Sequence, residues 1–331
     1  MATFSTDLLA IDPPSTSILI ERRIREIVLG FLRRRGAVVG LSGGVDSSVT
    51  AALCARALGK ERVFGILMPE YESADDSLQL GRALAGCLGI DHVVEEVGPI
   101  LESQRCYQRR DDAIRKVIPE YSDSWKSKIV LPDLVSSNNY ALFWIVAESP
   151  TGERHKARLS SEAYRTIVAA TNFKQRTRKM MEYYHADRLW FAVAGTPNRL
   201  EYAQGFFVKN GDGAADFKPI AHLYKSQVYQ LGRYLGVPEE ILRRPPTTDT
   251  YTLEQTQEEF YFALPLEQMD LCLYAKNNGI PSAEVAKAIG LSQEQVDRVF
   301  HMIESKLRAS KYLHLSPQLV VPVGEVSPYL D

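Results

Sequence analysis

Short apolar runs alternate with longer amphipathic stretches along most of the chain. The apolar runs have the composition of buried strands and lie at residues 37–39, 62–69, 91–97 and 189–194. The amphipathic stretches have helical spacing and lie at residues 15–35, 46–59, 73–89, 161–186 and 224–236. Ser73 is expected to cap the third of these helices. Strands that alternate with helices predict an α/β fold with a doubly wound parallel sheet and helices on both faces.

Two segments depart from this alternation. Residues 107–160 contain a β-prone patch within residues 129–147, which indicates an insertion, either a hairpin or a flap. From Leu253 onward the pattern is helical and is interrupted at Pro265. Residues 286–299 have the spacing of a helix-turn-helix, but the second helix carries Glu294 and Asp297 where a DNA reader needs basic and polar residues. An ordinary pair of packed helices is therefore favoured.

Composition narrows the class of protein. The 331 residues are 45% hydrophobic and carry a net charge of −2, so nothing indicates a general nucleic-acid surface. No signal peptide and no apolar run long enough to cross a membrane is visible, which predicts a cytoplasmic protein that binds no membrane. The four cysteines are far apart in the sequence, which argues against a zinc site or a disulfide framework.

The most informative stretch is residues 37–50, with the sequence AVVGLSGGVDSSVT. A short strand runs into a glycine turn and then into a helix, an arrangement that forms an anion site. Gly43 and Gly44 allow a ligand to approach the backbone closely, and the helix N-terminus adds partial positive charge. The serine hydroxyls are hydrogen-bond donors, and Asp46 can hold a hard cation beside phosphates.

Two familiar phosphate loops are excluded here. No lysine follows the glycines as a Walker A loop requires, and the spacing differs from the dinucleotide fingerprint. The segment Ser-Gly-Gly-Val-Asp-Ser at residues 42–47 instead resembles the pyrophosphate loop of the ATP pyrophosphatase superfamily, whose Rossmann-like members cleave ATP to AMP and pyrophosphate. A glycine turn with a Ser/Asp helix cap is the simpler alternative. Met68, at the end of the second predicted strand, lines an adenine pocket or belongs to the core.

A second specified region follows the fourth predicted strand. Residues 195–201 read GTPNRLE and residues 205–216 read GFFVKNGDGAAD, which combines carboxylates, a lysine and glycines behind one strand end. Each residue has a structural alternative: Glu201 as a surface charge, Asp212 in an Asx turn and Lys209 as a solvated cation. Because parallel sheets bind ligands beyond the carboxyl ends of their strands, a binding role for the whole group is favoured.

Several segments together resemble the bacterial ammonia-dependent NAD synthetases. They lie at residues 42–47, 172–178, 195–201, 206–216, 223–228, 246–247, 255–256 and 310–311. The resemblance implies a single domain over residues 1–331 of the ATP pyrophosphatase type, with an insertion at residues 107–160 and a helical C-terminal part at residues 254–315. It also implies a ligase that joins carbon to nitrogen: deamido-NAD, ATP and ammonia give NAD, AMP and pyrophosphate through an acyl adenylate.

The resemblance assigns roles to the matching residues. Asp46 and Glu201 are implied magnesium ligands, and Asp46, Lys225 and Thr247 are implied catalytic residues. Four residues are implied to bind the acid substrate, namely Arg176, Lys209, Asp216 and Lys311. The implied ATP-binding residues are Gly40, Leu41, Ser42, Gly43, Gly44, Val45, Asp46, Ser47, Met68, Thr196, Lys225 and Thr247.

The sequence departs from the family on the side of the acid. Val208 stands where the family has a threonine before the lysine, and Asn210 stands where it has an aromatic residue after the lysine. Ser310 replaces the family's histidine. An amidoligase of the same superfamily that acts on another acid is therefore kept as an alternative. A tRNA-modifying member is disfavoured by the lack of a CxxC pair, and a catalytically silent ATP-binding protein by the two implied metal ligands.

The nitrogen donor and the assembly are also expectations. About forty residues precede the glycine loop, too few for a glutaminase domain, and residue 2 is alanine, not a nucleophilic cysteine. Ammonia is therefore expected to be free or delivered by a separate glutaminase. The resemblance implies a homodimer with the dinucleotide site at the subunit interface.

Overall fold

The predicted parallel sheet is confirmed, and its strand order is β3-β2-β1-β7. The computed structural model describes residues 4–130, 143–247, 251–321 and 323. The strands are β1 (Ala37–Gly40), β2 (Val63–Leu67), β3 (Asp91–Val94) and β7 (Ala192–Val193). Ala37 lies opposite Val63 on one side and Ala192 on the other, so the three strands end near the same edge. That edge presents the glycine loop.

Both faces of this sheet are covered because the strands are apolar at successive positions. Ala37, Val39 and Leu41 pack into one core, which is formed with helices α1 (Pro13–Arg25), α2 (Val45–Leu58), α3 (Asp75–Leu88), α8 (Lys225–Tyr234) and α9 (Glu239–Arg243). Val38 points to the other face and packs with Ala186 of the long helix α6 (Ser161–Leu189). The alternation of neighbouring side chains thus builds a layer of helices on each side.

Several element boundaries differ from the predictions, most clearly at the first helix, at the start of α3 and at the fourth strand. The first helix ends at Arg25 and continues as a π-helical turn, Glu26–Phe31. Ser73 is not the cap of α3, because the cap position is Ala74 and the Ser73 hydroxyl instead accepts a hydrogen bond from the Glu70 N–H at 3.0 Å. The fourth strand is shorter than predicted, since α6 continues through Leu189 before the chain turns.

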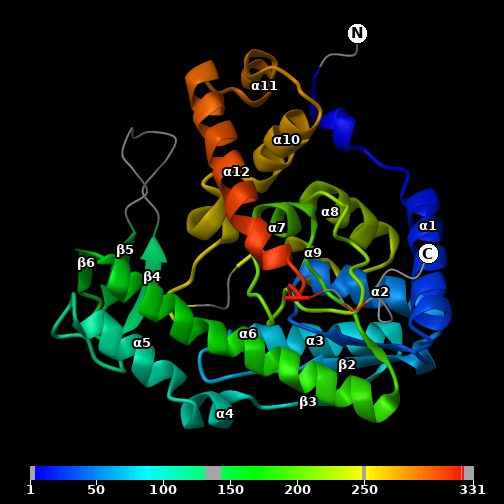
Figure 1. The fold of residues 1–331 in the computed structure, drawn as a ribbon, viewed down its shortest axis with the longest axis horizontal. Helices are drawn as coiled ribbons and strands as arrows, with labels where there is room; N and C mark the ends of the chain where they lie inside the picture. The colour runs from blue at the N-terminus through cyan, green and yellow to red at the C-terminus, as the bar shows by residue number, and fades with distance from the viewer. Residues whose placement is uncertain (1–3, 131–142, 248–250, 322, 324–331) are drawn as a thin grey trace.

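Helices α4 (Gly98–Ser103) and α5 (Cys106–Arg115) follow β3. The predicted insertion at residues 107–160 contains most of α5 and a separate antiparallel sheet. Its strands are β4 (Lys126–Val130), β5 (Trp144–Glu148) and β6 (Arg154–Arg158), in the order β4-β5-β6. The middle of the predicted β-prone patch, residues 131–142, lies outside the described residues. Ile129 and Ile145 of this sheet pack against Ile167 of α6. The same helix therefore supports both sheets (Figure 1).

The C-terminal part is helical, as predicted, and Pro265 precedes a helix start. A π-helical turn, Glu258–Phe262, leads to α10 (Leu266–Asn277), α11 (Ser282–Ile289) and α12 (Gln293–His314). These helices enclose a core of their own together with Leu200 of α7 (Arg199–Gln204). Within the described residues, no helix combines the length and apolar character needed to cross a bilayer.

Candidate active site

The glycine loop has the geometry of an anion site. The loop leaves β1 at Gly40, and α2 begins at Val45 directly after it. Gly43 has a φ of +74°, and a Cβ there would lie 2.8 Å from the Ser77 carbonyl oxygen, so only glycine fits. The Ser42 and Ser47 hydroxyls lie 3.1 Å apart and brace the turn. The free N–H groups at the start of α2 add positive potential.

A cavity of about 750 Å³ extends from this loop across the sheet edge. It is lined by Glu201 and by every predicted ATP-binding residue except Gly43: Gly40, Leu41, Ser42, Gly44, Val45, Asp46, Ser47, Met68, Thr196, Lys225 and Thr247. Met68 lines the cavity and also packs against the core cluster that contains Val38, and its contact with adenine stays a prediction. The structure therefore brings the predicted ATP-binding residues into one cavity.

Asp46 stands at the centre of the polar contacts in this cavity. Its carboxylate forms an ion pair with Lys225 Nζ at the start of α8. Asn198 Nδ2 donates to Asp46 Oδ1 at 3.1 Å. Burial lowers the pKa of Lys225, but the facing carboxylates of Asp46 and Glu201 outweigh it and hold that pKa above its ordinary value. Lys225 is therefore a cation when a phosphate enters.

Glu201 lies in the first turn of α7 and is held on two sides. Its carboxylate accepts from the Asn198 N–H at 3.1 Å, as in a capping box, and from Gln257 Nε2 at 3.1 Å. Burial, and next the negative charge of Asp46, raises the pKa of Glu201 to about 8. Two carboxylates that repel each other across a cavity fit a cation between them.

The residues present fit a magnesium ion only as part of its coordination. The described residues hold no group of three or more His, Cys, Asp or Glu side chains arranged around one point. Magnesium is usually bound by one or two carboxylates together with waters and phosphate oxygens. Asp46 and Glu201 match that donor set, since both line the cavity beside the glycine loop.

The sequence reasoning missed three residues that hold this site. Asn198 and Gln257 orient the two carboxylates. Asp270 of α10 is fully buried, and it accepts from the backbone N–H groups of Lys225 at 3.1 Å and Ser226 at 2.8 Å. Burial raises the pKa of Asp270 to about 6. A signal existed for two of them: Asn198 lies in the specified segment of residues 195–201, and Asp270 is a lone charge within the apolar run MDLCL.

The predicted acid-binding residues lie beside the cavity and do not line it. Arg176 is exposed on α6 and donates to the Lys209 carbonyl oxygen at 3.3 Å. Lys209 Nζ in turn donates to the carbonyl oxygen of Tyr312, the residue next to Lys311, at 2.9 Å. Asp216 is exposed and accepts from the Tyr183 hydroxyl at 3.2 Å. Arg176, Lys209 and the end of α12 that carries Lys311 are thus brought together on one face.

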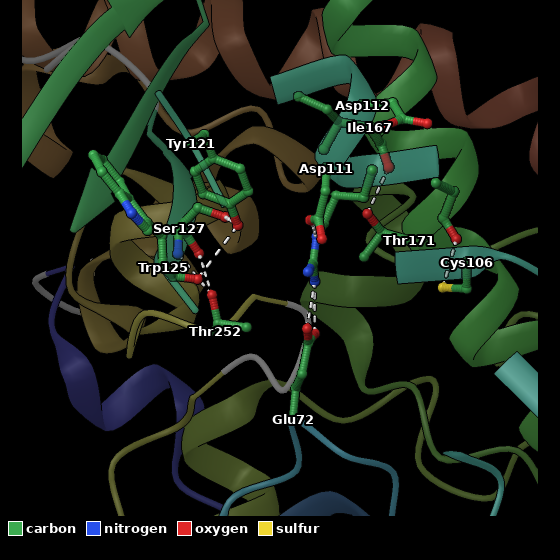
Figure 2. Close-up of polar contacts among 12 residues, drawn as sticks. Glu72, Cys106, Asp111, Asp112, Tyr121, Trp125, Ser127, Ile167, Thr171 and Thr252 are labelled. Carbon is green, nitrogen blue, oxygen red and sulfur yellow. Dashed lines mark hydrogen bonds and ion pairs between the residues drawn. The ribbon is translucent and has the colours of Figure 1, made fainter. Parts of the chain in front are cut away.

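A buried ionic network supports the cavity wall from below. Lys174 Nζ lies 2.9 Å from Glu70 Oε1 and 2.6 Å from Glu72 Oε2. Arg110 of α5 holds the other side of Glu72 with two bonds of 2.8 and 2.7 Å and also pairs with Asp111 (Figure 2). Breaking one member of a buried network of this kind costs about 3–5 kcal/mol. The network therefore fixes the loop after β2, which lines the cavity.

The inserted sheet supports the opposite wall. Ser127 of β4 donates its N–H to Thr252 Oγ1 at 2.6 Å (Figure 2). The Leu253 N–H donates to the Ser127 carbonyl oxygen at 3.1 Å. Gln255 Nε2 donates to the Ile129 carbonyl oxygen at 2.8 Å. These contacts anchor the chain segment just before Gln257, the residue that holds Glu201.

Comparison with known proteins identifies close relatives. The profile of the NAD synthase family matches residues 20–118 and 145–310. The NH3-dependent NAD+ synthetase of Rhizobium meliloti is 57% identical over 323 residues, which cover 98% of this chain and 96% of the relative. The NH3-dependent NAD+ synthetase of Mesorhizobium japonicum is 56% identical over 318 residues, covering 96% and 100%.

Solved structures share the fold at low sequence identity. NMN synthetase from Francisella tularensis is 22% identical with a TM-score of 0.65, and the match covers 95% of this chain and all of that one. NH3-dependent NAD synthetase from Campylobacter jejuni is 23% identical with a TM-score of 0.61, covering 94% and 100%. At these identities the likeness establishes the fold alone.

Proposed function

The chain belongs to the NAD synthase family, and on that premise we propose that it amidates deamido-NAD with ATP and ammonia to give NAD. The observation that carries the proposal is the cavity in which Asp46, Lys225 and Glu201 meet beside the glycine loop. The names of the relatives supply the acid and the nitrogen donor. The residues in the cavity supply the means to handle a triphosphate.

The reaction has two steps that these residues serve. A carboxylate oxygen of the acid attacks the α-phosphorus of ATP, the bond to the bridging oxygen breaks, and pyrophosphate leaves. Ammonia then attacks the acyl carbon, the bond to AMP oxygen breaks, and the nitrogen loses a proton to leave the amide. The Lys225 ammonium and the N–H groups at the start of α2 stabilise the charge that develops on phosphate oxygens in the first step.

The proposal includes a magnesium ion held by Asp46 and Glu201. When bound, this ion neutralises charge on the phosphate oxygens. Asn198 and Gln257 contribute by fixing where the two carboxylates point. Thr196 and Thr247, which line the same cavity, are proposed to bind ATP through their hydroxyls.

A homodimer is also part of the proposal. Large apolar side chains are exposed on α1 and the turn after it, including Ile18 (61% exposed) and Phe31 (69% exposed). Several exposed large apolar side chains on one stretch of chain favour a second protein chain as their cover. Light scattering on the purified protein tests this, and a monomeric mass at micromolar concentration would contradict it.

The direct test is an incubation of the purified protein with ATP, magnesium, ammonium and deamido-NAD. We expect NAD and pyrophosphate in equal amounts, and neither product when the acid or ATP is left out. Nicotinate mononucleotide and other acids in place of deamido-NAD test the alternative acid. Pyrophosphate release with another acid, but none with deamido-NAD, would replace the proposed substrate.

A further inference from the structure

Helix α12 contributes one face to the cavity, and that face carries a lysine. Met302, Ser305 and Lys306 line the cavity together, as residues three and four positions apart on one helix do. They lie on the same wall as Tyr261 and Phe206, whose rings stack with centroids 4.5 Å apart. Apart from Phe206, this wall belongs to the C-terminal part of the chain, and all of it is separate in sequence from the glycine loop.

Lys306 differs from the other lysines of the cavity in its partners. Lys174, Lys179 and Lys225 each form an ion pair with a carboxylate. Lys306 Nζ donates to the Tyr261 carbonyl oxygen and lies 3.8 Å from the centroid of the Tyr261 ring. Among the described residues, no carboxylate forms an ion pair with Lys306.

An ammonium in this position lacks a counter-charge. Burial lowers the pKa of Lys306 to about 7, because a half-buried cation that has no anion beside it is costly. An anion that enters the cavity would remove this cost and gain a charge-assisted hydrogen bond. Two substrates of the proposed reaction, the acid and ATP, are anions, so either one supplies the missing charge.

The location of Lys306 favours the acid over ATP. The ATP phosphates have Lys225 and the start of α2 at the glycine loop. Lys306 lies instead on the helix whose end carries Lys311 and contacts Lys209, two of the predicted acid-binding residues. The stacked rings of Phe206 and Tyr261 beside it are suited to a flat aromatic ligand.

We propose that Lys306 binds an oxyanion of the acid substrate, either its carboxylate or a phosphate of its nucleotide part. The proposal rests on the proposed function, since it takes the acid to be an aromatic nucleotide. It adds an ionic contact that the family resemblance did not assign. The carboxylate and the phosphates share the chemistry that a lysine recognises, and the two are separable by experiment.

The test is equilibrium binding by calorimetry with Lys306→Met, which keeps the length and apolar stem of the side chain. Deamido-NAD carries both the carboxylate and the phosphates, whereas NAD carries only the phosphates. We expect Lys306→Met to weaken deamido-NAD binding by about 10- to 150-fold, the effect of one lost charge-assisted bond. If the partner is the carboxylate, NAD binding should be unchanged; if it is a phosphate, NAD binding should weaken equally.

Controls separate this contact from a structural role. Lys306→Arg keeps the charge and should retain most of the affinity, and ATP binding should be unchanged in both variants. Arg308→Met removes an exposed charge from the same helix and should bind like wild type. If Lys306→Met is poorly folded by thermal denaturation, Lys306→Gln replaces it in the same comparison.

Two outcomes overturn different claims. Wild-type affinity of a folded Lys306→Met or Lys306→Gln protein for deamido-NAD would overturn the role of Lys306 and leave the proposed function intact. A wild-type protein that neither binds nor amidates deamido-NAD would overturn the proposed function. In that case the comparison is repeated with the acid that releases pyrophosphate, and unchanged binding of that acid would again reject Lys306.

Discussion

Asn198 Nδ2 donates to Asp46 Oδ1 at 3.1 Å and so joins the glycine loop to the segment 152 residues further along the chain. The same side chain accepts from the Leu200 and Glu201 N–H groups and caps α7. Asn198 therefore fixes the aspartate and the helix that carries the glutamate. Because one residue has both tasks, two substitutions can separate them.

Asn198→Ser should keep the cap and lose the contact with Asp46, since serine is a good N-cap but is too short to reach the carboxylate. We expect kcat/KM for ATP to fall about tenfold, equivalent to about 1.4 kcal/mol. Asn198→Ala should lose the same activity and a further ~1 kcal/mol of unfolding free energy for the cap. Urea denaturation and steady-state kinetics measure the two effects. Equal stability of the serine and alanine variants would show that the cap contributes nothing.

Removing either proposed magnesium ligand should affect turnover more than folding. Asp46→Asn and Glu201→Gln keep side-chain size, and each replaces one carboxylate of the proposed donor set with an amide. We expect each to lower kcat by at least about tenfold, which corresponds to roughly 1.4 kcal/mol of lost transition-state contact. The magnesium concentration that gives half the maximal rate should rise in both variants. Near-normal turnover with an unchanged magnesium dependence in both variants would reject the metal assignment.

The sequence was sufficient to predict a structural feature where one short segment contains all the residues that form it. The strand, glycine turn and helix start at residues 37–50 require only local geometry, so this arrangement was visible before the fold. The parallel sheet followed from the alternation of apolar and amphipathic segments. Ser73 shows the limit of such local reasoning. Its hydroxyl accepts a hydrogen bond from the earlier Glu70 N–H, and α3 begins one residue later than a cap at Ser73 would require.

Contacts between distant segments could not be predicted in this way. Gln257 meets Glu201 across 56 residues, and Asp270 meets the backbone of Lys225 across 45. No periodicity in the sequence encodes these pairs, because they depend on how α7, α8 and α10 pack. The exposed positions of Arg176 on α6 and of Asp216 in the segment before α8 were equally hidden, since a charged residue gives no sign in the sequence of whether it faces a cavity or solvent.

The buried Asp270 carboxyl should make folding stability depend on pH. Its pKa is raised from 3.8 to about 6, so between these values the folded chain holds a proton that the unfolded chain has lost. The contribution of this group to the free energy of unfolding therefore falls as pH rises from about 4 to about 6. We expect wild type to lose up to about 3 kcal/mol relative to Asp270→Asn across this range. Urea denaturation at stepped pH measures the difference.

An exposed carboxylate provides the control for that measurement. Glu294→Gln removes a charge at the exposed start of α12 and should show no comparable pH-dependent difference from wild type. A flat difference between wild type and Asp270→Asn over the same range would show that Asp270 titrates at its ordinary value.

The nitrogen donor gives a prediction that needs no substitution. We expect ammonium salts to support amide formation by this chain and glutamine alone to give none, because relatives 57% and 56% identical to nearly the whole chain are named NH3-dependent synthetases. At fixed total ammonium the rate should rise as pH is raised from neutral. Free ammonia attacks the acyl adenylate, and the fraction of the total ammonium that is present as free ammonia increases with pH. NAD formation from glutamine at a rate similar to that from ammonium would contradict the proposal.

Arg176 and Arg178 lie on the same helix but in different surroundings. Arg178 lines the cavity and donates to the Met68 carbonyl oxygen at 3.2 Å, whereas Arg176 is exposed and contacts Lys209. Gln175 and Val208, the sequence neighbours of Arg176 and Lys209, do line the cavity. An acid as long as a dinucleotide would therefore extend from the cavity toward Arg176.

If Arg176 binds the acid there, Arg176→Ala should raise KM for the acid about 10- to 150-fold, the effect of roughly 1.5–3 kcal/mol from one charge-assisted bond. KM for ATP should stay nearly unchanged. Arg176→Lys should recover only part of the loss, because an ammonium cannot present a bidentate fork. Arg165→Ala, an exposed arginine earlier on α6, is the matched control and should behave like wild type.

The alternative is that Arg176 makes only a surface contact, worth under about 1 kcal/mol. Kinetics with each substrate varied in turn decide between the two, since a surface contact would leave both KM values unchanged. Combining Arg176→Ala with Lys306→Met then tests whether they bind the same substrate at separate points. Independent contacts should give losses in acid affinity that add as free energies, because distant sites without shared partners rarely couple. An unchanged acid dependence in Arg176→Ala would leave Lys306 as the proposed ionic anchor of the acid within the cavity.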